Sequence, residues 1–256
     1  MAVQDGTAAG ATTVDPSEVA RFERIARTWW DPHGAMKTLH RFNPVRVGFI
    51  RDRVAGHHGR DAEGGRPLEG LSVLDVGCGG GLLCEPLARL GAKVTGIDPA
   101  PTNVDVARLH AGKSGLPIDY RRTTVEEVVA AGDRFDIVLA MEVVEHVSDV
   151  DLFVSTCCRA VKPGGLLLYE TFMAGNEMYG KPSRPEFLLR PNELAQWVYG
   201  DFRVIAFDQM PERGADGKPV AMKQRIAAIR NLPEVEGDSP PATPEPGQSG
   251  DPAKPQ

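Results

Sequence analysis

The sequence has little of several features that mark whole classes of protein. It has four cysteines among 256 residues, none at the spacings of a structural zinc site, so we expect free thiols and a reducing, cytoplasmic setting. No apolar run approaches the roughly 20 residues that a membrane-spanning helix needs. The net charge of −6 leaves no concentrated basic face, so we expect no nucleic-acid partner.

Both ends of the chain lack the composition of a folded segment. Residues 1–14 have neither the basic start nor the apolar centre of a secretory signal and predict a disordered extension. Residues 233–256 are rich in proline and polar residues and predict a disordered tail, because they cannot bury enough apolar surface to offset their ordering entropy. The folded domain is therefore expected over residues 15–232, with a helical cap at residues 15–55.

Strand and helix patterns alternate from residue 71 onward. The first five strands are expected at residues 72–77, 93–98, 118–124, 135–141 and 166–172. Alternation with helices predicts parallel βαβ units and the α/β class. The last two strand patterns, residues 202–210 and 222–230, have only a loop between them and predict an antiparallel hairpin. A seven-stranded, Rossmann-like sheet with an antiparallel terminal strand is the architecture of class I methyltransferases.

The stretch "VLDVGCGGGLL", residues 73–83, joins the first strand to its helix at the end of the sheet where α/β proteins bind ligands. A phosphate loop would need Gly-Lys-Ser/Thr here, which is absent. A dinucleotide fingerprint would need glycine or alanine where Leu82 stands. Asp75, two residues before Gly77, repels a phosphate but suits a cationic ligand.

S-adenosylmethionine meets these conditions, because it has no phosphate and carries an ammonium and a sulfonium. Backbone at Gly77 and Gly79 can approach it without a Cβ clash, and Asp98, at the end of the second strand, can bind both ribose hydroxyls. We therefore expect Asp75, Gly77, Gly79 and Asp98 to bind this cofactor.

A second motif, "MEVVEHV", follows the fourth strand on the same rim. The i, i+3, i+4 spacing would place Glu142, Glu145 and His146 on one face of a helical turn. Three interpretations stay open. The residues bind Mg²⁺, which acidifies the acceptor; His146 and Glu145 work as metal-free acid–base groups; or the turn is structural.

Four stretches of the chain follow a known pattern: "FERIARTWWDPHGAMKTLHRFNPVRVGFI", "LDVGCGGGLL", "MEVVEHV" and "VKPGG". Together they closely resemble the ubiquinone-biosynthesis O-methyltransferases over residues 17–168. The resemblance implies that Arg46, Gly77, Asp98 and Met141 contact S-adenosylmethionine and that the acceptor is a phenol or catechol of the ubiquinone-precursor type. It also supports the divalent ion, which eukaryotic members of the family bind with the matching residues.

The segment after the fifth strand, residues 170–198, is polar, broken by prolines and without a long amphipathic face. The C-terminal third is therefore expected to depart from the family, and membrane association is not expected. Two alternatives remain: a methyltransferase acting on another small molecule, and a non-catalytic regulator that binds the cofactor or its product. Trp29, Trp30 and Phe42 are expected either to pin the helical cap or to form an apolar lid over an aromatic acceptor.

Overall fold

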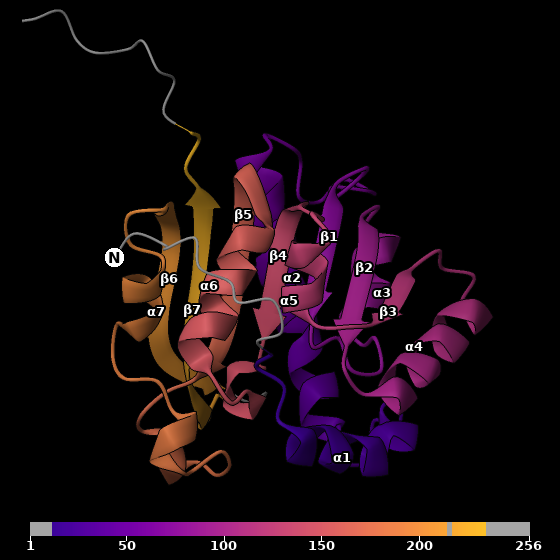
Figure 1. Cartoon of the computed structure of the whole chain (residues 1–256), viewed down its shortest axis with the longest axis vertical. Helices are drawn as coiled ribbons and strands as arrows, with labels where there is room; N and C mark the ends of the chain where they lie inside the picture. The colour runs from indigo at the N-terminus through magenta and orange to yellow at the C-terminus, as the bar shows by residue number, and fades with distance from the viewer. Residues whose placement is uncertain (1–11, 214–216, 234–256) are drawn as a thin grey trace, which may run out of the picture.

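A computed structural model describes residues 12–213 and 217–233, which contain a seven-stranded sheet with helices on both faces (Figure 1). The strands are β1 (Ser72–Val76), β2 (Lys93–Asp98), β3 (Asp119–Arg122), β4 (Phe135–Met141), β5 (Val161–Phe172), β6 (Phe202–Arg213) and β7 (Pro219–Arg230). Their order in the sheet is β3-β2-β1-β4-β5-β7-β6. The predicted seven-stranded α/β architecture is confirmed.

The predicted reversed strand is also confirmed. Neighbouring strands from β3 to β5 run parallel, whereas β7 pairs antiparallel with β5 on one side and with β6 on the other. The β6–β7 hairpin forms because the short connection leaves no room for a crossover helix. Parallel strands covered on both faces are largely apolar, and β4 and β5 follow this rule from Ile137 to Met141 and from Leu166 to Tyr169.

Helices cover both faces of the sheet (Figure 1). They are α1 (Pro16–Ile25), α2 (Lys37–His57), α3 (Cys84–Arg89), α4 (Pro101–Lys113), α5 (Val125–Ala130), α6 (Val150–Ala160) and α7 (Glu193–Trp197), with 3-10 turns η1 (Ala26–Thr28), η2 (Val144–His146), η3 (Asn176–Met178) and η4 (Pro185–Phe187). One core joins α2, α3 and α4 to the sheet, and the other joins α5, α6 and α7. None of these helices is both long and apolar enough to cross a membrane.

The expected helical cap at the N-terminal end is present. Asp15 caps α1 through its carboxylate, which accepts from the Ser17 backbone N–H at 2.8 Å. The second helix begins at Lys37 and continues through Pro44. Of the extension expected at residues 1–14, residues 1–11 lie outside the described residues, but Thr13 is buried and donates its hydroxyl to Glu126 at 2.6 Å. Of the predicted tail, residues 234–256 also lie outside the described part.

The site lies at the carboxyl ends of the parallel strands. The strand order reverses between β1 and β4, and crevices at such points bind ligands in open α/β sheets. The α1 helix lies across this end of the sheet, at the bottom of the view in Figure 1. The glycine turn after β1, Asp98 at the end of β2 and the η2 turn after β4 therefore meet beneath the cap.

Candidate active site

The glycine turn after β1 has the backbone geometry that its sequence requires. Gly77 and Gly79 have φ values of 69° and 53°, in the left-handed region that glycine adopts without strain. The Gly79 backbone N–H donates to Asp98 Oδ2 at 2.9 Å, which ties the turn to the end of β2. A Cβ on Gly77 would lie 2.8 Å from Val143, so the turn also touches the loop after β4. Three of the predicted site segments thus lie together.

Asp98 is held by a set of backbone and side-chain donors. Its Oδ1 accepts from the Ala100 backbone N–H at 2.9 Å and from the Asn103 amide at 3.2 Å. Among the described residues, Oδ2 accepts the Gly79 N–H alone. This oxygen therefore keeps a free acceptor position. Burial raises the pKa of Asp98, although these donors oppose the shift. The carboxylate is fixed in place and can still receive a hydroxyl.

Trp29 and Trp30 fasten the cap onto the glycine turn. The Trp29 indole N–H donates to Asn103 Oδ1 at 2.8 Å, and the Trp30 N–H donates to the Gly80 carbonyl at 2.9 Å. Trp30 also stacks on His110, with ring centroids 3.4 Å apart and planes 5° from parallel. Trp29 and Trp30 were expected either to pin the cap or to form a lid over the acceptor, and in this structure both pin the cap. Phe42 lies elsewhere, with its ring centroid 5.0 Å from the Lys223 ammonium.

Asp75, two residues before the glycine turn, is buried. Its buried carboxylate accepts from the Cys84 thiol at 3.0 Å, and burial raises its pKa to about 6. A direct contact with the cofactor through this carboxylate stays a prediction. The thiols of Cys84 and the three other cysteines are free, as expected from their spacing.

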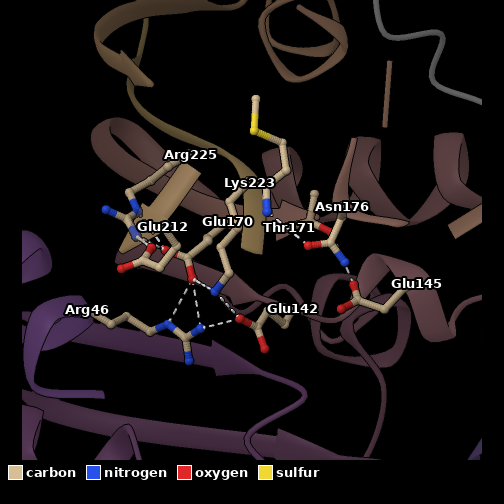
Figure 2. A network of polar contacts seen from close by, with 10 residues as sticks. Arg46, Glu142, Glu145, Glu170, Thr171, Asn176, Glu212, Lys223 and Arg225 are labelled. Carbon is tan, nitrogen blue, oxygen red and sulfur yellow. Dashed lines mark hydrogen bonds and ion pairs between the residues drawn. The ribbon is translucent and has the colours of Figure 1, made fainter. Parts of the chain in front are cut away.

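A buried ion-pair network occupies the rim beside β4, β5 and β7 (Figure 2). Glu170 accepts from Arg46 at 2.7 Å, from Lys223 at 3.0 Å and from Arg225 at 2.6 Å. Arg225 also pairs with Glu212 at 3.1 Å. Each buried cation has a carboxylate partner, as burial of charge requires. Sequence reasoning missed Glu170, Lys223, Arg225 and Glu212, although charged residues inside otherwise apolar strand patterns were a visible signal.

Glu142 belongs to this network rather than to a helical turn. Arg46 Nη2 donates to its Oε1 at 2.8 Å, and the Lys223 ammonium contacts the same oxygen. Glu142 has φ of 58°, uncommon outside glycine and costly in strain, which the two ion pairs offset. Burial opposes ionisation, but the two cations outweigh it and lower the pKa of Glu142. Burial would likewise lower the pKa of Arg46, but Glu170 and Glu142 raise it.

Glu145 is a buried carboxyl that accepts from the Thr171 hydroxyl, which donates to Oε2 at 3.2 Å. Burial, reinforced by the neighbouring Glu142 carboxylate, raises the pKa of Glu145 to about 8. Glu145 is therefore mostly protonated at neutral pH, and its acid–base and metal-binding roles stay predictions.

His146 lies on the opposite side of this loop from the ion-pair network, against the cap. Its Nδ1 lies 2.8 Å from Glu18 Oε2, and its ring meets Phe22 edge-on with centroids 4.9 Å apart. Burial lowers the pKa of His146, although Glu18 opposes the shift, so the imidazole is neutral near pH 7. No described residue hydrogen-bonds with Nε2.

The expected common face of Glu142, Glu145 and His146 is wrong. The backbone turns left-handed at Glu142, and only residues 144–146 form a helical turn, so the three side chains have three different sets of partners. Across residues 12–213 and 217–233, no three acidic, histidine or cysteine side chains lie close enough together to bind a metal ion. In this arrangement the three residues do not share a metal site, because the Glu142 carboxylate already pairs with Arg46 and Lys223 and His146 faces Glu18.

The chain was compared with known proteins. A model of the methyltransferase domain matches residues 74–169. The chain is 62% identical over 239 residues to a ubiquinone biosynthesis O-methyltransferase from Methylobacterium sp. (strain 4-46), a match covering 85% of this chain and 96% of that protein. A protein of the same name from Chelativorans sp. (strain BNC1) is 46% identical over 245 residues, covering 88% of this chain and 97% of the relative.

The fold is similar to that of solved methyltransferases. Magnesium protoporphyrin IX methyltransferase from Synechocystis PCC 6803 superposes with a TM-score of 0.59 at 19% identity, covering 83% of this chain and 94% of that one. N-methyltransferase NodS from Bradyrhizobium japonicum WM9 gives a TM-score of 0.58 at 15% identity, covering 84% and 97%. At such identities the likeness shows the class I methyltransferase fold alone.

The expected departure of the C-terminal third is wrong. Matches over 85% and 88% of the chain extend well past residue 168. The polar composition of residues 170–198 concealed a packed segment, in which η3, η4 and α7 alternate with loops and bury Met173, Leu189 and Leu194. The chain therefore belongs to the ubiquinone biosynthesis O-methyltransferase family of S-adenosylmethionine-dependent methyltransferases.

Proposed function

We propose that this enzyme methylates a phenolic hydroxyl of an aromatic ubiquinone precursor and that His146 is the base that removes the phenol proton. The observation that carries the proposal is the placement of His146 on the rim, with Glu18 beside its Nδ1 and no described residue paired with its Nε2. The lowered pKa of this imidazole keeps it neutral near pH 7. The names of the relatives support the acceptor class. Because a free phenol has a pKa of about 10, a base within reach lowers the cost of forming the phenolate near neutral pH.

The cofactor half of the site fits S-adenosylmethionine. The turn at Gly77 and Gly79 has the left-handed backbone of a ligand-binding glycine turn, and Val143 and Trp29 lie against it in this structure. The fixed Asp98 carboxylate has an acceptor position for a ribose hydroxyl. When bound, the cofactor supplies an electrophilic methyl group on a positively charged sulfur. The family resemblance supports two further contacts with the cofactor, Arg46 of α2 and Met141 at the end of β4. In this structure the Arg46 guanidinium pairs with Glu142 and Glu170.

The chain contributes alignment and proton transfer. The rim would hold the acceptor hydroxyl next to the methyl donor, and such positioning lowers the barrier by several kcal/mol. His146 Nε2 takes the hydroxyl proton while the oxygen electron pair forms the new C–O bond. The bound cofactor would supply the methyl group, and the electrons of its C–S bond would remain on sulfur. Glu145 is not assigned the base role, because a carboxyl with a pKa of about 8 is protonated near pH 7.

The test compares His146→Asn with His33→Asn, which changes an exposed histidine of the cap. A prenylated catechol and S-adenosylmethionine are the substrates, and methylated product is measured by mass spectrometry. We expect His146→Asn to lower kcat by about a hundredfold or more, as for loss of a general base, with His33→Asn unchanged. An unchanged rate in His146→Asn would remove the base assignment. Turnover of short-chain phenols but not of the prenylated catechol would overturn the acceptor class.

A further inference from the structure

The imidazole of His146 contacts one face of α1. The sequence predicted this helix as part of the cap but gave it no role at the site. Glu18 and Phe22 are four residues apart, so they lie above one another on the same side of the helix. Phe22 presents its ring to the imidazole at an interplanar angle of 81°, and Glu18 Oε2 lies 2.8 Å from Nδ1. Two neighbouring side chains of one helix thus fix both the plane of the ring and the environment of one nitrogen.

The position of Glu18 bears on which nitrogen carries the proton. A neutral imidazole has one N–H donor and one lone pair, and its tautomer is set by the partner of each nitrogen. A carboxylate beside Nδ1 favours the proton on Nδ1 and leaves the lone pair on Nε2. The contact between Nδ1 and Glu18 has the distance of an ion pair without the geometry of a hydrogen bond, and no other described group pairs with Nδ1 or Nε2. The carboxylate also stabilises the imidazolium that forms once Nε2 has accepted a proton.

We propose that Glu18 is a positioning residue for catalysis, which orients His146 so that Nε2 is the nitrogen that receives the proton of the acceptor hydroxyl. The proposal rests on the proposed role of His146. The proton passes from the acceptor oxygen to Nε2, the resulting positive charge is shared with the Glu18 carboxylate across Nδ1, and the proton later returns to solvent. Glu18 neither donates nor accepts a proton in this scheme.

The cap does not depend on Glu18 for its attachment. Trp29 and Trp30 join it to Asn103 and Gly80 through hydrogen bonds, and Asp15 caps α1. The remaining contact of Glu18 is an ion pair with Arg21 at 2.9 Å, on an exposed part of the helix, where such pairs contribute little to stability. Glu18 can therefore be changed with the cap still in place.

The experiment uses four variants of the full chain: Glu18→Gln, Glu18→Asp, the control Glu23→Gln and the double variant Glu18→Gln/His146→Asn. Glu23 lies on the same helix, where its carboxylate meets the Thr102 hydroxyl at 3.5 Å. In Glu18→Gln the amide can donate to Nδ1 and so place the imidazole proton on the wrong nitrogen. We expect kcat to fall by roughly ten- to a hundredfold in Glu18→Gln, within the range of general-base effects, and to recover partly in Glu18→Asp.

Two further measurements separate positioning from mere structure. The KM for S-adenosylmethionine and the affinity for S-adenosylhomocysteine by calorimetry should match wild type in Glu18→Gln. In the double variant kcat should equal that of His146→Asn, because a residue that acts through His146 has no effect without it. Equal kcat in Glu18→Gln and Glu23→Gln, or an additive loss in the double variant, would overturn the proposal. Full activity in His146→Asn would instead refute the base assignment, and the role of Glu18 with it.

Discussion

Trp29 lies directly on Gly79: a Cβ at residue 79 would come within 2.4 Å of the indole ring. The same is true of Gly80, whose added Cβ would lie 2.4 Å from Trp29 Cβ and Cγ. The glycines therefore serve the packing of the cap as well as the approach of a cofactor. Because the cap covers the turn this closely, any ligand on Gly79 must share the space with Trp29 or shift it.

Gly79→Ala should destabilise the fold. The new methyl group meets Trp29, and φ of 53° is unfavourable for alanine, so we expect a loss of about 2–3 kcal/mol in the free energy of unfolding. Denaturant unfolding measures it. The matched control is Gly112→Ala in α4, which has open space around its Cα and should be neutral or stabilising. Adding Trp29→Ala to Gly79→Ala should recover the packing part of the loss; no recovery would mean that strain alone is responsible.

The sequence identified the parts of the site that come from one short stretch each. The glycine turn follows β1, Asp98 ends β2 and His146 lies in the turn after β4, and these strands could be recognised from their alternation with helices. Lys223 and Glu142 are 81 positions apart, and Arg46 and Glu170 are 124 positions apart, so no local pattern could pair them. Such contacts depend on the register of β5 against β7, in which Phe172 faces Lys223.

The error at "MEVVEHV" has a different origin. The expectation of a shared face assumed right-handed helical backbone from Glu142 to His146. The Glu142 carboxylate is drawn instead to the cations Arg46 and Lys223, and the left-handed φ at this residue follows from long-range ion pairs that a single sequence does not display. Residue types at the site could be predicted from the sequence, but their partners could not.

Lys223→Met should cost far more than removal of a surface lysine. Its ammonium is buried and joins Glu142 to Glu170, so its loss leaves two buried carboxylates short of a partner. We expect about 3–5 kcal/mol, measured as a shift of the denaturant midpoint. Lys162→Met, which breaks a half-exposed pair with Asp136 at 2.9 Å, should cost less than about 1 kcal/mol. Similar losses in the two variants would show that the network contributes no more than a surface pair.

The stability of the protein should respond to pH through Glu145. Its pKa is about 8 in the folded state against 4.5 ordinarily, so between these values the folded protein holds a proton that the unfolded chain has lost. The contribution of this proton to the free energy of unfolding is therefore fully present below about pH 4.5. It is lost as pH rises towards 8, by up to about 1.4 kcal/mol per pH unit. Glu145→Gln removes this dependence, so its stability relative to wild type should increase from pH 5 to pH 8. A constant difference would contradict a raised pKa.

Asp98→Asn should weaken cofactor binding without unfolding the protein. The substitution keeps the shape of the side chain but removes its charge. The new NH₂ group must face a backbone N–H, that of Gly79 or of Ala100, with which it cannot form a hydrogen bond. Loss of a charge-assisted hydrogen bond costs about 1.5–3 kcal/mol, so affinity for S-adenosylhomocysteine should fall by roughly ten- to a hundredfold. Calorimetric titration measures it, with a thermal melt to establish that the variant is folded. Asp105→Asn, on the exposed side of α4, is the matched control and should bind like wild type. Equal affinity in the two variants would remove Asp98 from the cofactor site and leave the glycine turn with a purely structural role.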